Sequence, residues 1–235
     1  MATERRRKNQ KGQEMVEFAI VVVLFIPLIM GSFIVGMNLI RSNYANQVCR
    51  DLTDIYIHGG DFSTYSMQQL AQRLAQGLNL QIGASFTGNQ QSNTGNAGNG
   101  LVTVTQIMWV GGTTSPNCVA VGAANCTNHD NFVYTQQIQF GNANLANSST
   151  VTLGNPGNGA VLTSAGIVQN PVTDSNAALG SVPQAAMKAM WQTTNNGQTS
   201  LTDGQLVYIV ETFFQSPDLT LGSMAGNGVY ARYFF

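Results

Sequence analysis

The feature that most constrains this chain is an uncharged apolar run of 23 residues, Phe18–Ile40. Fifteen of these residues are Phe, Ile, Leu or Val, and their favourable transfer into lipid outweighs the cost of Pro27 and Asn38. As a helix the run is about 35 Å long, which exceeds the ~30 Å hydrocarbon core of a bilayer. It predicts a single transmembrane helix.

The charges around this run are distributed unevenly. Five of the ten basic residues lie before Gly12, whereas five basic and ten acidic residues follow it. A basic segment beside an apolar helix favours a topology signal, with the N-terminus in the cytoplasm, over a nucleic-acid-binding arm. The rest of the chain has only scattered basic residues to neutralise phosphates, so we expect no nucleic-acid partner. Charged residues make up only 9% of the chain, which favours an exported body.

A cleaved secretory signal is the alternative for the apolar run. Such signals have an apolar core of about 7–15 residues followed by a small-x-small site. Here the core is longer, and it ends in Met-Asn-Leu-Ile-Arg without such a site. We therefore expect the helix to stay attached to the body.

A seven-residue segment, Gly12–Phe18, joins the basic run to the apolar run and carries Glu17. A carboxylate at the mouth of an apolar helix is costly unless it is paired or kept at the interface. One interpretation is that Glu17 meets the positive end of the helix dipole. The alternative comes from the order of a basic leader, a glycine, a glutamate five residues later and an apolar helix. This order resembles the processing site of type IV pilin-like precursors. Val16–Val21, with a proline in the apolar run, is similar to the TadE family of pseudopilins of tight-adherence pilus systems.

The resemblance, which covers residues 5–40, implies that an aspartyl prepilin peptidase cuts between Gly12 and Gln13. It also implies that Glu17 neutralises the new amino terminus, its own or a neighbouring subunit's, within a bundle of apolar helices. The implied partners are inner-membrane lipid, the prepilin peptidase and other pilin-like subunits. The implied location is the inner (cytoplasmic) membrane, with the head outside the cytoplasm, and it allows incorporation into an extracellular pilus.

The apolar helix is expected to continue beyond the membrane to Ile57, before His58-Gly59-Gly60. Helical spacing places one apolar stripe on a single face, formed by Tyr44, Val48, Leu52, Ile55 and Tyr56. The expected helix runs from Glu14 to Ile57. A second helix is expected over residues 64–78, with a capping box at Ser66 and Gln69. The low-complexity segment 87–100 is predicted to be a loop.

Strands are predicted over residues 101–110 and 132–140, joined as a long hairpin by the segment that contains Cys118 and Cys126. Pro183 is expected to open a short helix. Further strands are predicted over residues 206–214 and 229–235, pairing through the Gly222–Gly228 region. The predicted fold class is α+β and pilin-like: a long N-terminal transmembrane and spine helix packed on a small antiparallel sheet. The expected domains are a leader, residues 1–12, a transmembrane and spine helix, residues 13–58, and an extracytoplasmic head, residues 59–235.

Three cysteines leave at least one thiol unpaired within the chain. We favour a disulfide between Cys118 and Cys126 over two free thiols, because an exported location permits it and the small residues between them allow a tight loop. Cys49 is expected to be a buried free thiol, with pairing to another chain as the alternative.

We find no catalytic or metal-binding motif in the sequence, and we expect neither enzymatic activity, a cofactor nor a metal. His58 and His129 are the only histidines. His129 lies in a polar turn that is more typical of a solvated loop than of a cation site. Acids assembled only by the fold would escape this reasoning, so an anchored envelope enzyme stays open.

Two functions lead from these observations. The first is a pilus-assembly pseudopilin or minor pilin that is processed after Gly12 and assembles through its apolar helix. The alternative is an uncleaved single-pass envelope protein whose head is a binding module. The two differ in whether the mature chain begins at Gln13.

Overall fold

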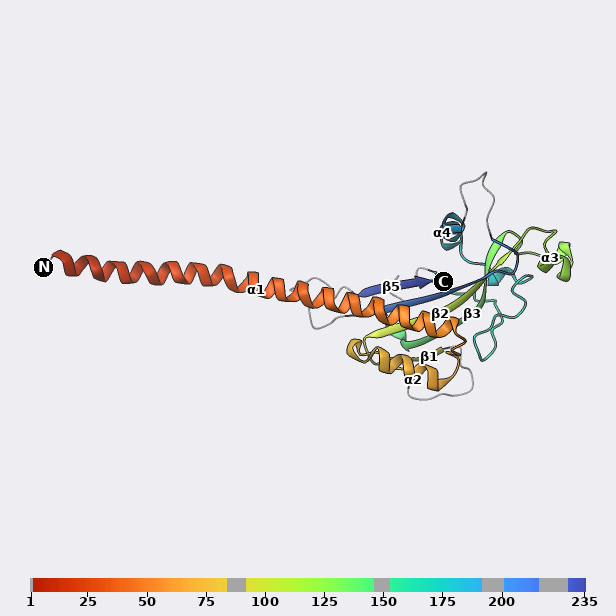
Figure 1. Ribbon diagram of the computed structural model, residues 1–235, viewed down its shortest axis with the longest axis horizontal. Helices are drawn as coiled ribbons and strands as arrows, with labels where there is room; N and C mark the ends of the chain where they lie inside the picture. Colours follow the sequence, from red (N-terminus) through yellow and green to blue (C-terminus); the bar gives the residue numbers. More distant parts are fainter. Residues whose placement is uncertain (1, 84–91, 146–152, 192–200, 216–227) are drawn as a thin grey trace. The chain divides into compact units, whose positions relative to one another are not determined.

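The computed structural model describes residues 2–83, 92–145, 153–191, 201–215 and 228–235. By the contacts between its residues the chain divides into two compact units, Met1–Asn43 and Tyr44–Phe235, and each unit is described by itself. Figure 1 shows the ribbon.

Helix α1 (Ala2–Ile57) is continuous and includes Pro27. Its end agrees with the sequence prediction, but its beginning does not, because the helix starts twelve residues before Glu14. The leader is rich in Arg, Lys, Gln and Glu, which are strong helix formers, and it contains no proline. Helix propensity therefore extends α1 through the leader, which the prediction left outside the helix.

In the described part of the chain, five strands form one sheet in the order β1-β3-β2-β4-β5. All neighbouring strands are antiparallel except β1 and β3. The strands are β1 (Ser92–Gly95), β2 (Gly100–Val110), β3 (Asn131–Asn142), β4 (Leu206–Phe214) and β5 (Val229–Phe234).

Most of the predicted pairing is confirmed. Strands β2 and β3 form the expected antiparallel hairpin, with a bulge between Gln106 and Ile107. Strands β4 and β5 are antiparallel neighbours. Of the predicted turn between them, residues 222–227 lie outside the described residues. The connection between β2 and β3 contains two short helices, α3 (Pro116–Val121) and η2 (Ala123–Asn125).

Strand β1 corrects the prediction of a plain loop over residues 87–100. Its four residues, Ser-Asn-Thr-Gly, have no apolar side chain, but they pair in parallel with the outer edge of β3. An edge strand presents unpaired backbone N–H and C=O groups, and a polar segment can satisfy them as well as an apolar one. Residues 87–91 of the predicted loop lie outside the described residues.

One face of the sheet packs against the last turns of α1, as the apolar stripe predicts (Figure 1). Val48, Leu52 and Tyr56 are buried there, and Tyr44 and Ile55 are partly buried against the same cluster. Fully burying a side chain of this size contributes about 1.5–3 kcal/mol. The sheet side of the cluster consists of Val102, Val104, Ile138, Phe140, Val210, Phe214 and Ala231.

Helix α2 (Tyr65–Leu74) is followed by the short helix η1 (Gln76–Leu78), which confirms the helical segment predicted over residues 64–78. The predicted capping box is wrong, because Thr64 is the N-cap residue and it makes no side-chain capping bond. The turn before α2 is ordered instead by Asp61, whose Oδ1 accepts a hydrogen bond from the backbone N–H of Ser63. The Oγ1 of Thr64 donates to the backbone oxygen of Asp61.

The opposite face of the sheet has its own cluster, in which Trp109 and Phe132 pack with ring centroids 5.0 Å apart. Helix α4 (Ser181–Trp191) contributes Met187, which is buried. The helix predicted around Pro183 is thus confirmed. Short helices η3 (Ala143–Leu145) and η4 (Ser175–Ala177) lie in the long connection before it.

A long apolar N-terminal helix whose last turns pack on a mostly antiparallel sheet is a pilin-like α+β architecture. The fold class predicted from the sequence is confirmed.

Candidate functional site: the amino-terminal half of helix α1

The predicted processing site, Gly12 and Gln13, lies within the helical backbone of α1. Glycine is the weakest helix former apart from proline and costs about 1 kcal/mol relative to alanine in a helix interior. Residues 2–11 have no glycine or proline. Gly12 is therefore the position near the start of α1 where local unwinding costs least.

Glu17 lies on the exposed surface of α1, five residues after Gly12. In a helix, positions 13 and 17 are one turn apart on the same side, separated by a rise of about 6 Å. The backbone nitrogen of Gln13 would become an amino terminus on cleavage. The helix therefore brings the backbone nitrogen of Gln13 close to the carboxylate of Glu17, and the resemblance implies that these two groups pair after cleavage.

The surface of α1 between Phe18 and Ile40 carries exposed apolar side chains on all sides. Phe18 is 69% exposed, and large apolar side chains continue around the helix. Its most apolar 18-residue window has a mean hydropathy of 2.9, and none of that window is buried. A helix that is hydrophobic all round requires lipid or other helices around it. Among the described residues this is the one helix long and apolar enough to cross a membrane, and a signal sequence near the N-terminus has the same features.

Gly31 and Gly36 lie in this apolar segment. A Cβ atom added at either position would meet no atom within 4 Å. Among the residues that the structure describes, nothing packs closely enough on either position to require a glycine, and small residues of this kind let another helix approach closely.

No protein-family model, curated protein or solved structure matches the chain. The pilin-like description therefore comes from the architecture alone. The candidate site is defined by Gly12, Gln13 and Glu17 and by the apolar surface of α1.

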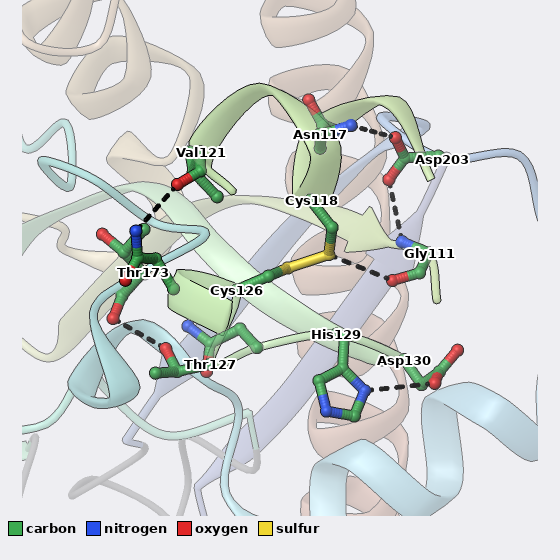
Figure 2. The surroundings of a disulfide bond; sticks show 12 residues. Gly111, Asn117, Cys118, Val121, Cys126, Thr127, His129, Asp130, Thr173 and Asp203 are labelled. Carbon is green, nitrogen blue, oxygen red and sulfur yellow. Dashed lines mark hydrogen bonds and ion pairs between the residues drawn. A yellow bond between two sulfur atoms is a disulfide. The ribbon is translucent and has the colours of Figure 1, made fainter. Parts of the chain in front are cut away.

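The head has a disulfide between Cys118 and Cys126, with the Cα atoms 5.1 Å apart (Figure 2). The expected loop between them is α3 and η2. Cys49 is buried and is a free thiol, on the face of α1 that meets the sheet. Its Sγ lies 3.2 Å from the backbone oxygen of Val210, to which it donates.

Asp203 holds the start of α3 beside the end of β2 (Figure 2). Its carboxylate oxygens accept hydrogen bonds from the backbone N–H groups of Gly111 and Asn117, each at 2.8 Å. Burial alone would raise the pKa of Asp203, but these donors outweigh burial and hold its pKa below the ordinary value. Asp203 is thus a structural carboxylate, and its role escaped the sequence reasoning because 86 residues separate it from Asn117.

Neither histidine belongs to a cluster of potential metal ligands among the described residues. His129 Nδ1 is 3.3 Å from Asp130 Oδ2, and both side chains are exposed (Figure 2). His58 is exposed beside Asp54 near the end of α1. In the part of the chain that the structure describes, no three His, Cys, Asp or Glu side chains come together.

Sequence reasoning also missed a polar row across the face of the sheet opposite α1. Gln139, Thr103, Glu211 and Arg232 lie directly opposite one another on β3, β2, β4 and β5. Glu211 is only 2% exposed, and its Oε1 accepts hydrogen bonds from the backbone N–H of Leu153 and the hydroxyl of Tyr230. The signal in the sequence was a glutamate inside the mostly apolar strand LVYIVETFF.

Covering this row is the segment around Leu153. The hydroxyl of Tyr134 donates to the backbone oxygen of Leu153 at 2.6 Å, and Gln137 Nε2 donates to that of Gly154 at 2.9 Å. Burial raises the pKa of Tyr134, with the charge of Glu211 adding to the rise, so its hydroxyl stays protonated and donates. The contacts of Tyr134, Gln137 and Glu211 assign the row a structural role.

Proposed function

We propose that this chain is a pseudopilin or minor pilin that a prepilin peptidase cleaves between Gly12 and Gln13. The cleaved protein is anchored in the inner membrane by Phe18–Ile40, assembles with other pilin-like subunits through that helix and carries its head outside the cytoplasm. The observation that carries the proposal is the exposed, all-round apolar surface of α1, which contains one carboxylate near its beginning. The pilin-like architecture supports the same assignment.

The position of Gly12 supports cleavage at this point. A protease needs an extended backbone at the bond it cuts, whereas α1 is helical there. Because glycine destabilises a helix, unwinding is easiest at Gly12. Gln13 and the residues after it then keep the helical form needed for packing.

Glu17 supports assembly. A new ammonium group at Gln13 and a carboxylate one turn later offset each other's charge, either within one chain or between neighbours. Burying such charges in an apolar bundle is tolerated mainly when they are paired.

Cleavage is tested by expressing the full chain in a bacterial host with and without an active prepilin peptidase, followed by mass spectrometry of the N-terminus. The expected mature chain begins at Gln13 only when the peptidase is active. Gly12→Val should block the cut, whereas Gly31→Val, at a position with open space around it, should leave it unchanged. An intact N-terminus in the presence of a peptidase that processes a known substrate would contradict the proposal.

Assembly is tested separately by crosslinking subunits in membranes. Glu17→Gln should be cleaved normally but form several-fold fewer crosslinked oligomers. Glu14→Gln, the same change three residues earlier in α1, is the matched control and should assemble normally. Equal crosslinking of both variants would remove the role of Glu17.

The second candidate is an uncleaved single-pass envelope protein whose head binds a ligand. The segment closed by the disulfide favours this candidate, because the apolar side chain of Val119 is exposed there, next to the buried Cys118. The N-terminal measurement separates the two functions, since this candidate retains the leader.

A further inference from the structure

The exposed side of α2 and the chain after it form a hollow of about 530 Å³. Leu80 is a buried residue of its lining, and the other lining residues are polar side chains from α2, from η1 and from the segment after η1. The lining residues are Gln69, Gln72, Arg73, Gln76, Asn79, Leu80 and Gln81.

The chemistry of the lining favours an anionic, oxygen-rich ligand. Each glutamine and asparagine amide can donate hydrogen bonds, and Arg73 adds a cation with a planar fork of donors that matches phosphate oxygens. No acidic residue occurs among the described residues of the lining. Arg73 is exposed, so its guanidinium is accessible from solvent.

The chain beside this hollow contacts Tyr44, the first residue of the second unit. The hydroxyl of Tyr44 donates to the backbone oxygen of Leu74 at 2.6 Å, next to Arg73. A Cβ atom at Gly77 would lie 2.8 Å from the Tyr44 ring, so the chain after α2 is held closely against that ring.

Tyr44 follows Ile40, the last residue of the apolar run, by four positions. Four residues span at most about 14 Å even when fully extended, whatever the orientation of the two units. Tyr44 therefore lies close to the headgroup layer of any membrane that Phe18–Ile40 spans, and tyrosine is enriched at that level.

We propose that this hollow binds the headgroups of anionic phospholipids on the outer surface of that membrane. The inference rests on the proposed membrane span but not on cleavage or assembly. Arg73 contacts the lipid phosphate, and the surrounding amides donate to phosphate and glycerol oxygens. The contact would restrain the head against the membrane before any assembly step.

Two other hollows suit this ligand less well. The larger one, between α1 and β5, is lined by Asp51 and Asp54 as well as by arginines. The hollow beside Gln137 and Gln139 has no basic residue among its described lining. The hollow over α2 combines a cation with an absence of acidic lining.

The test uses the full chain in vesicles of phosphatidylcholine, with or without phosphatidylglycerol. A fluorophore is attached through Leu70→Cys, at a position 40% exposed on α2 and outside the lining of the hollow. Val182→Cys, at a position 79% exposed on α4, is the control. The native cysteines do not compete for the label, because Cys118 and Cys126 are bonded and Cys49 is 1% exposed. The readout is quenching by a headgroup-labelled lipid.

We expect phosphatidylglycerol to increase quenching at position 70 but not at position 182. Arg73→Gln should lower the ratio of contacting to free heads about fivefold, the effect of one basic residue near an anionic surface. Arg73→Lys should retain most of the contact. Lys188→Gln, the same loss of charge on α4, should leave the ratio unchanged.

Three results would overturn the inference. One is equal quenching at position 70 in both lipid compositions, and another is an unchanged ratio for Arg73→Gln. The third is quenching at position 70 that added inorganic phosphate abolishes, which would assign the hollow to free phosphate instead of the lipid. Membrane insertion is measured separately by resistance to alkaline extraction. Failure to insert overturns this inference and the proposed span together, whereas insertion without a lipid-dependent contact overturns this inference alone.

Discussion

The Nε atom of Arg232 on β5 lies 3.6 Å from Oε1 of Glu211 on β4, and the two residues are directly opposite in register. The glutamate is almost completely buried, whereas the arginine side chain is partly exposed. The guanidinium also lies over the ring of Phe234, 5.1 Å from its centroid. One end of the polar row thus reaches solvent while its centre is enclosed.

Replacing Glu211 by alanine should destabilise the head strongly. The change removes the carboxylate that accepts hydrogen bonds from the hydroxyl of Tyr230 and the backbone N–H of Leu153. A hydrogen bond to a charged group contributes about 1.5–3 kcal/mol. The measurement is denaturant unfolding of the full chain in detergent micelles, followed by near-ultraviolet circular dichroism. Asp54→Ala, at an exposed carboxylate, should change stability by less than about 0.5 kcal/mol. Similar losses for both variants would show that the buried row does not stabilise the fold.

Leu52→Ala should lower the free energy of unfolding of the head by about 2–5 kcal/mol, because the side chain is fully buried between α1 and the sheet. Leu28→Ala is the matched control in the same helix, at a side chain 67% exposed. It should leave unfolding of the head in detergent unchanged. An effect of Leu28→Ala as large as that of Leu52→Ala would contradict the division of α1 into an apolar anchor and a packed end.

Replacing Cys118 and Cys126 together by serine should cost about 2.5 kcal/mol, the loop-closure term for a bridge across eight residues. Thermal unfolding should also show that a reducing agent lowers the melting temperature of the wild type toward that of the double variant. If the reducing agent lowered the melting temperatures of the double variant and the wild type by the same amount, the effect would not come from this disulfide.

The effect of Asp203→Asn should depend on pH. The pKa of Asp203 is lowered in the folded state, so its ionised form contributes stability above its unfolded-state pKa of about 3.9. That contribution is lost as the pH falls through the lower, folded-state pKa. The melting temperature of the variant should therefore lie below that of the wild type at neutral pH, and the difference should shrink below about pH 4. A difference that stays constant down to pH 3 would contradict this role.

The elements predicted correctly are those whose signal is local or periodic. The apolar stripe from Tyr44 to Tyr56 follows from helical spacing alone, and it packs on the sheet as predicted. The segments predicted as strands over residues 101–110 and 132–140 are close enough in the chain to pair as a hairpin. Strand β1 could not be predicted in this way, because its pairing depends on the exposed edge of β3 and not on its own side chains.

The sequence by itself determined that Phe18–Ile40 needs an apolar environment. Exposing the apolar side chains of this run to water along a helix of about 35 Å would be unfavourable. It also placed Gly12, Gln13 and Glu17 within one continuous segment. Only the tertiary structure decided that Glu211 is buried and paired with Arg232, and that Asp203 holds the start of α3. These roles depend on which distant segments cover or approach a side chain, and the free energy of a carboxylate depends on that environment far more than on its neighbours in the chain.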